Sequence, residues 1–256
     1  MIDIPPSTSP DATPGTVSEA PVPNSPVPNS PVPNSPVPDA PVDAPVPDPP
    51  VKDRAAAWHL LNLHTQSASL LKHALSVEVC VRAYGQQHAA ELGLPPDQAR
   101  AMEQLYAITG LLHDFDYEKH PTPAEHPWVG NRILTEQGWP EEVRHAILGH
   151  AQYSGTPRIS HLDQALFACD ELAGFLTANA LVKPTKSILD VNTASVLKKL
   201  KDKAFARGVN REDIRIGAAE LGVELDRHVA FCLAAMQQHA EALGLAGTER
   251  ETGQSA

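Results

Sequence analysis

The sequence predicts an all-α protein, with a bundle of about eight or nine helices after a proline-rich N-terminal segment. Three observations support this fold class. In residues 51–245, apolar residues recur three and four positions apart, which is the period of one helix face. Several of these runs begin at Pro, Asp or Ser and end at Gly, as helices do. No segment shows the alternating pattern of a half-buried strand.

The N-terminal segment has a different composition. Residues 1–50 hold 17 of the 25 prolines, no Lys, Arg or aromatic residue, and three copies of PVPNS. Closely spaced prolines favour extended polyproline geometry, and too few large apolar side chains are present to offset the entropy of ordering the segment. We therefore expect residues 1–50 to be a disordered tail, either a spacer or a ligand for a proline-recognising partner. We expect residues 246–256 to be a flexible C-terminal tail.

The predicted helices follow one another through the domain at residues 51–245. The run at 94–115 starts with prolines and Asp97, a residue type that caps helices. Pro127 stands where a first helical residue is expected, and Pro140 precedes two glutamates that the helix dipole favours. The expected helices lie within residues 53–66, 67–93, 94–115, 126–138, 140–151, 160–182, 193–208, 210–222 and 224–244.

Charge and cysteine content narrow the class of protein. The formal net charge is -11, and the tail contributes six acidic and no basic residues, so the remainder carries -5. This mild acidity argues against a nucleic-acid partner, which requires a basic surface. The three cysteines form no CxxC pair, which fits a reducing compartment. Neither a secretory signal nor a membrane-spanning run is evident. We expect a cytoplasmic protein without a membrane partner. Whether the chain forms a homo-oligomer is left open.

Imidazoles and carboxylates interrupt the apolar runs at four places. His73 lies in LLKHALSV, His113 and Asp114 end ITGLLHD, His150 ends AILGH, and Asp170 lies in ALFACDELAGF. A carboxylate on an apolar helix face is costly unless it is paired or binds a cation. One such residue alone is most often a satisfied core group, but the recurrence favours a metal site. This mixture of ligands suits Zn, Fe, Mn, Mg or Co.

The order of these residues resembles the HD-domain metal-dependent phosphohydrolases, in their HDIG-type branch. A His at 73, the adjacent pair His113-Asp114 and the distant Asp170 match that signature. The segments GLLHDFDYE, EHPWVGNRILTEQGWPEEVRHAILGH and ALFACDELAGF follow the order and spacing of the branch, and the resemblance covers roughly residues 70–240. It implies an HD-domain helical bundle.

Three features depart from the motifs of that superfamily. The third and fourth positions of the HDIG motif are Phe115 and Asp116, so its Gly is missing. Ala151 follows His150, where some two-metal cyclic-dinucleotide phosphodiesterases carry a second His, and their GYP triplet is absent. These departures leave the number of metal ions and the substrate open.

The resemblance also implies a site and an activity. One divalent ion would bind at His73, His113, Asp114 and Asp170, and His126 and His150 match the extra histidines of two-metal branches. The implied reaction is hydrolysis of a phosphoester or phosphoanhydride of a small molecule, such as a nucleotide, by metal-activated water. Asp114 is expected to bridge if two ions bind, and Asp116 to act as a general base or to orient a ligand.

The remaining expectations concern the substrate and the alternative functions. Lys183 and Lys186 follow the helix that carries Asp170 in an irregular stretch, so we expect them to bind phosphate; the alternative is a solvated basic face. A non-catalytic HD-fold module that senses or binds a metal or a nucleotide is the first alternative function. A di-iron HD-fold oxygenase is the second, since the same ligand set can activate dioxygen.

Overall fold

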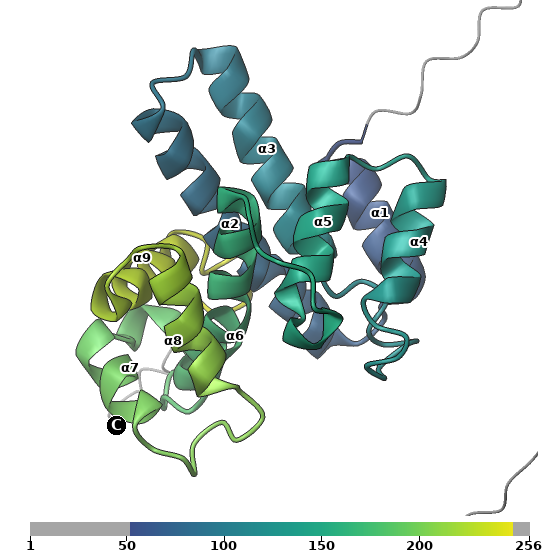
Figure 1. The fold of residues 1–256 in the computed structure, drawn as a ribbon. Coiled ribbons are helices and arrows are strands. Elements are labelled where there is room, and N and C mark those ends of the chain that lie inside the picture. Colours follow the sequence, from purple (N-terminus) through teal and green to yellow (C-terminus); the bar gives the residue numbers. More distant parts are fainter. Residues whose placement is uncertain (1–51, 248–256) are drawn as a thin grey trace, which may run out of the picture. The chain divides into compact units, whose positions relative to one another are not determined.

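The computed structural model describes residues 52–247 and confirms the all-helical fold within them (Figure 1). The described part contains nine α-helices, two short 3-10 helices and no strand. The predicted tail at 1–50 and residues 248–256 lie outside the described residues. The elements are α1 Arg54–His64, α2 Ala68–Glu91, α3 Pro96–Leu112, α4 Trp128–Glu136, α5 Glu141–His150, η1 Gln152–Ser154, α6 His161–Leu181, η2 Ile188–Asp190, α7 Thr193–Leu200, α8 Arg211–Glu220 and α9 Leu225–Gln238.

Helices α2 and α3 form an antiparallel hairpin (Figure 1). Two glycines allow their backbones to approach closely. A Cβ atom at Gly110 would lie 3.0 Å from the Cα atom of Glu78, and one at Gly85 would lie 2.7 Å from the side chain of Tyr106. The hairpin therefore holds the C-terminal end of α3 against the part of α2 that follows His73.

Helix α6 is the central helix of the domain, packed against α2, α5, α8 and α9. Most of its apolar side chains are buried, and Leu166, Leu172 and Phe175 are fully so. It begins at a capping box, in which Ser160 accepts a hydrogen bond from the Asp163 N–H and the Asp163 side chain accepts one in return. Asp170 is thus carried on the most buried helix of the fold.

Helix α8 lies close against α6 because its packing face contains glycine. A Cβ atom at Gly217 would lie 2.5 Å from the Cα atom of Ala168, so no larger residue fits without moving backbone. Asn210 caps α8 by accepting hydrogen bonds from the N–H groups of Glu212 and Asp213. These two features fix the position of the N-terminal turn of α8 relative to Asp170.

Two helices, α7 and α9, end well before the last residue of the segment in which each was predicted. The predicted helix at 193–208 stops at Leu200, and residues 201–209 are irregular. The guanidinium of Arg211 donates to the backbone carbonyls of Asp202, Phe205, Ala206 and Val209, which holds this segment in a non-helical path. Periodicity alone could not reveal this interaction, because it comes from Arg211, the first residue of the next helix.

The C-terminal part of the domain also differs from the prediction. Helix α9 ends at Gln238 rather than near residue 244, and turns follow it. The N–H of Ile188 donates to the Leu245 carbonyl at 2.8 Å, and the Ser187 hydroxyl donates to the Ala246 carbonyl at 2.8 Å. The folded domain therefore extends past residue 245.

None of the helices in the described part is long and apolar enough to cross a membrane.

Substitution of Gly217 by Ala should destabilise the domain. Alanine is the better helix former, but its Cβ atom would press on the backbone of α6, so we expect the free energy of unfolding to fall by about 1–3 kcal/mol. Urea unfolding followed by far-UV circular dichroism measures this change. Gly208→Ala is the matched control, because nothing lies within 4 Å of its Cβ position. Equal stability of the Gly217→Ala variant and the native protein would contradict this packing.

Candidate metal centre

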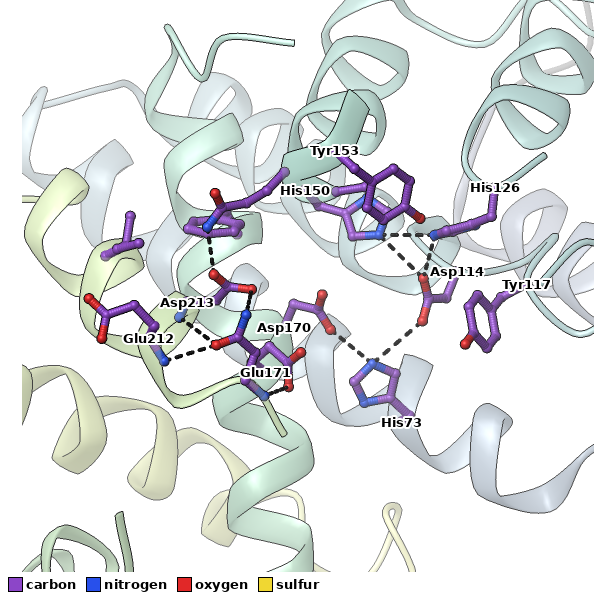
Figure 2. A pocket seen from close by; sticks show the side chains of 15 residues that line it. His73, Asp114, Tyr117, His126, His150, Tyr153, Asp170, Glu171, Glu212 and Asp213 are labelled. Carbon is purple, nitrogen blue, oxygen red and sulfur yellow. Dashed lines mark hydrogen bonds and ion pairs between the residues drawn. The ribbon is translucent and has the colours of Figure 1, made fainter. Parts of the chain in front are cut away.

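The six predicted metal ligands converge at one place, although they come from several elements. Figure 2 shows five of them, all except His113. Two of the six end helices, and Asp114 follows directly on the end of α3. The six are His73 on α2, His113 as the C-cap of α3, Asp114 beside it, His126 just before α4, His150 at the end of α5 and Asp170 on α6.

Four of these side chains form a first group. His73 Nε2 lies 3.0 Å from Asp170 Oδ1 and 3.8 Å from Asp114 Oδ2. His113 Nε2 lies 3.2 Å from His73 Nε2 and 3.4 Å from each of the same two carboxylate oxygens. Ligand atoms about 2.1 Å from one ion lie roughly 3–4.2 Å apart, depending on the coordination geometry. His73, His113 and Asp114 could therefore hold one ion, and Asp170 lies within 3.4 Å of both imidazoles.

The second group uses the other oxygen of Asp114. His126 Nε2 lies 3.2 Å and His150 Nε2 lies 3.3 Å from Asp114 Oδ1. The two imidazole nitrogens are 3.3 Å apart. Since Oδ2 faces the first group and Oδ1 the second, Asp114 could contribute one oxygen to each group.

Hydrogen bonds on the far side of the rings define which imidazole nitrogens face the centre. His113 Nδ1 lies 2.8 Å from the Gly110 carbonyl, and His150 Nδ1 contacts the Ile147 carbonyl. A carbonyl can only accept, so Nδ1 carries the proton and Nε2 of the neutral ring presents a lone pair to the centre. Lone pairs so close to one another repel unless a cation lies between them. This donor set therefore fits a metal ion.

Asp116 lies behind His126 and not at the pocket surface. Its Oδ1 accepts from His126 Nδ1 at 2.8 Å, its Oδ2 accepts from the Gly130 N–H at 2.7 Å, and the residue is 1% exposed. A Cβ atom at Gly130 would lie 2.7 Å from this carboxylate, so glycine is required there. Of the two expected roles, this placement fits the second: Asp116 orients the His126 ring and does not face the pocket.

The segment after His113-Asp114 is attached to the junction between α1 and α2. The Thr65 hydroxyl donates to the Phe115 carbonyl at 3.0 Å. Glu118 accepts from the N–H groups of Gln66 and Ser67 at 2.7 and 3.0 Å, which caps the start of α2 in place of a side-chain cap from Ser67. The start of the helix that carries His73 is therefore fixed to the segment that carries Asp114.

The carboxylates make the centre favourable for positive charge. Burial lowers the pKa of His113, but Asp114 and Asp170 outweigh it and raise this pKa well above its usual value. Burial raises the pKa of Asp114, but His113 and hydrogen bonds from His126 and His150 hold it well below its usual value. Burial lowers the pKa of His126, yet hydrogen bonds to carboxylates raise it to about 9. A cation is therefore stabilised here, as a proton or as a metal ion.

A pocket of about 740 Å³ opens onto this centre. That volume suits a small-molecule ligand. No sequence pattern indicates that the start of α8 or the η1 turn faces the site, because Asn210 and Asp213 have the pattern of an ordinary helix cap. Apart from metal ligands, the pocket is lined by Tyr117, Ala151, Gln152, Tyr153, Phe167, Glu171, Asn210, Glu212, Asp213 and Ile216.

Glu171 is the pocket carboxylate next to a metal ligand in the sequence. Burial is the main cause that raises its pKa to about 7, and the neighbouring charge of Asp170 adds to it. The N–H of Asn210 donates to Glu171 Oε2 at 3.1 Å.

Lys183 and Lys186, the residues expected to bind phosphate, do not line the pocket. Helix α6 continues for 11 residues beyond Asp170, which carries the chain roughly 16 Å away before either lysine is reached. Burial and the nearby Lys183 ammonium lower the pKa of Lys199, so Lys183 belongs to a basic cluster near α7. The expectation was wrong because it equated closeness in sequence with closeness in space.

Comparison of the chain with protein-family models, with curated proteins and with solved structures gave no match. The function is therefore inferred from the geometry of the site.

Replacement of Asp114 by Ala removes the one carboxylate that faces both groups of ligands. We expect this variant to bind neither ion while its helical content stays nearly unchanged, because neither oxygen of Asp114 pairs with a helix backbone. Metal analysis after dialysis and far-UV circular dichroism measure the two effects. His150→Ala is the matched control and should lose only the ion of the second group. Full metal content in Asp114→Ala would show that the site lies elsewhere.

Replacement of Asp116 by Asn should weaken the second ion selectively. An amide NH₂ must then face either the Gly130 N–H or the His126 Nδ1–H, so one hydrogen bond is lost. Loss of such an outer partner typically lowers metal affinity about 10–100-fold. Calorimetric titration of the metal-free protein with Mn²⁺ measures both affinities, and the first group serves as the internal control. An equal loss at both groups would contradict a role confined to His126.

Proposed function

We propose that the protein is a metal-dependent hydrolase of the HD type that cleaves a phosphoester or phosphoanhydride bond of a small molecule. One observation carries this proposal: the Asp114 carboxylate lies between two groups of imidazoles and opens onto a pocket. Divalent ions held by these residues would activate a water molecule and withdraw charge from a phosphoryl oxygen.

The ligand chemistry favours some ions over others. Four of the six ligands are imidazoles, and only Asp114 and Asp170 are carboxylates. Imidazole suits Fe and Zn, whereas Mg prefers a shell of oxygen ligands. We therefore expect Mn, Fe, Co or Zn rather than Mg as the working ion.

Two tyrosines lie beside the centre on the pocket side. Figure 2 shows Tyr153 next to His150 and Tyr117 next to Asp114, and both residues line the pocket. Burial is the main cause that raises the pKa of Tyr153, so its hydroxyl stays protonated at neutral pH. A phenol hydroxyl donates hydrogen bonds, so these residues supply donors for the oxygens of a substrate held at the centre.

The proposal is tested by turnover with defined metals. The protein is stripped with a chelator, reloaded with Mn²⁺, Fe²⁺, Co²⁺ or Zn²⁺, and assayed for release of phosphate from nucleotides, sugar phosphates and p-nitrophenyl phosphate. We expect hydrolysis with at least one metal, and none in Asp114→Ala or after chelation. Lys183→Ala is the control, because this residue lies outside the pocket, and it should retain full activity.

Two other results would replace the hydrolase proposal. A metal-loaded protein that hydrolyses nothing in the panel but binds nucleotides would indicate a non-catalytic binding module. Dioxygen consumption by the ferrous form, without phosphate release, would indicate the di-iron oxygenase alternative.

A further inference from the structure

The pocket has a second wall, opposite the imidazoles of the metal centre (Figure 2). Asp213 accepts hydrogen bonds from the side-chain amides of Gln152 at 2.5 Å and Asn210 at 2.7 Å. Glu171 accepts from the Asn210 N–H at 3.1 Å. Amide groups of Gln152 and Asn210 thus hold the carboxylates of Glu171 and Asp213 in fixed positions. We call these four residues the acidic wall.

Within the described residues, no Lys or Arg forms an ion pair with the carboxylates of the acidic wall. No Lys or Arg lines the pocket in the described part of the chain, and Glu212 adds a third carboxylate beside the wall. Arg158 is the nearby cation: it stacks on the pocket residue Phe167 at 3.7 Å, and its charge lowers the pKa of Asp213, although burial has the larger effect and raises that pKa. Its guanidinium binds both carboxylate oxygens of Glu220 at 2.5 and 2.7 Å and donates to a backbone carbonyl.

The N-terminus of α8 does not compensate for this charge. The positive end of a helix attracts anions through its free N–H groups. Here the side chain of Asn210 accepts from the N–H groups of Glu212 and Asp213 at 3.0 and 3.4 Å, and both residues are acidic. The end of α8 that reaches the pocket is therefore capped and negatively charged.

The two ends of the pocket consequently favour opposite charges. A phosphoryl group belongs at the metal centre, where bound ions supply positive charge. If the bound molecule carried a second phosphate or a carboxylate at its other end, that group would face Glu171 and Asp213, and no cation would lie between the negative charges. An ammonium group there would instead form charge-assisted hydrogen bonds, because an ionised carboxylate accepts more bonds than the two that Asp213 makes.

We infer that the substrates are small aminoalkyl phosphates, with the phosphoryl group at the metal centre and the ammonium group on the acidic wall. This inference rests on the proposed hydrolase function and deepens it. It also disfavours nucleoside polyphosphates and dinucleotides as substrates, since these molecules carry several negative charges along their length.

The experiment measures binding separately from turnover. Isothermal titration of the metal-loaded protein uses three series of phosphonates, whose P–C bond is not hydrolysed, with chains of two to six carbons. The chains end in an ammonium, a methyl or a carboxylate group. At the best chain length, we expect the ammonium ligand to bind at least about tenfold more tightly than the methyl ligand, and the carboxylate ligand to bind most weakly.

Variants assign the preference to the acidic wall. In Asp213→Asn and in Glu171→Gln, both of which keep the side-chain size, the advantage of the ammonium ligand over the methyl ligand should shrink several-fold. Glu136→Gln, at the other end of α4 from His126, removes one exposed carboxylate and should leave the preference unchanged. Circular dichroism confirms folding of each variant.

The outcomes separate this inference from the proposed function. Equal binding of the three series, or tightest binding of the carboxylate series, would overturn the inference even if p-nitrophenyl phosphate is hydrolysed. A clear ammonium preference without hydrolysis of the matching aminoalkyl phosphates would support the acidic wall as a recognition element but reject the hydrolase. Loss of the preference in Glu136→Gln would show that it reflects net charge and not the wall.

Discussion

The architecture of the site depends on the charge of Asp114. Its two oxygens face imidazoles from four different parts of the chain, His73 and His113 on one side and His126 and His150 on the other. A carboxylate that is mostly withdrawn from water, as Asp114 is, is tolerated only where positive charge or hydrogen-bond donors surround it. The helices therefore have to meet at this point, and the hairpin of α2 and α3, the central α6 and the close approach at Gly110 are the features that allow them to do so.

Two of the ligands illustrate why imidazoles occur at helix ends. His113 and His150 each direct Nδ1 to a carbonyl three residues earlier in the same helix. The last carbonyls of a helix have no intrahelical partner, so they are free to accept this bond. The helix end thus satisfies one nitrogen, sets the tautomer and leaves the other nitrogen directed at the centre. The same backbone group that would otherwise need water serves to orient a ligand.

Much of the fold and the six converging side chains could be predicted from sequence, because a charged or imidazole residue within an apolar helical run is conspicuous. The errors have physical causes. The helix predicted to continue past Leu200 is interrupted by bonds from Arg211, a partner that periodicity does not reveal. For Asp116 two roles were left open, a general base or an orienting group, and only coordinates show that His126 lies between it and the pocket. The acidic wall was missed because Asn210 and Asp213 have the pattern of an ordinary helix cap.

The contact between Gly217 and Ala168 has a consequence for the length of the pocket. Ala168 precedes Asp170 by two residues on α6, so the helix that carries Asp213 of the acidic wall packs directly on the helix that carries a predicted metal ligand. Two backbone segments packed this closely resist movement relative to each other. The fold therefore fixes the spacing between the two ends of the pocket, so a bound molecule must match the site in length as well as in charge.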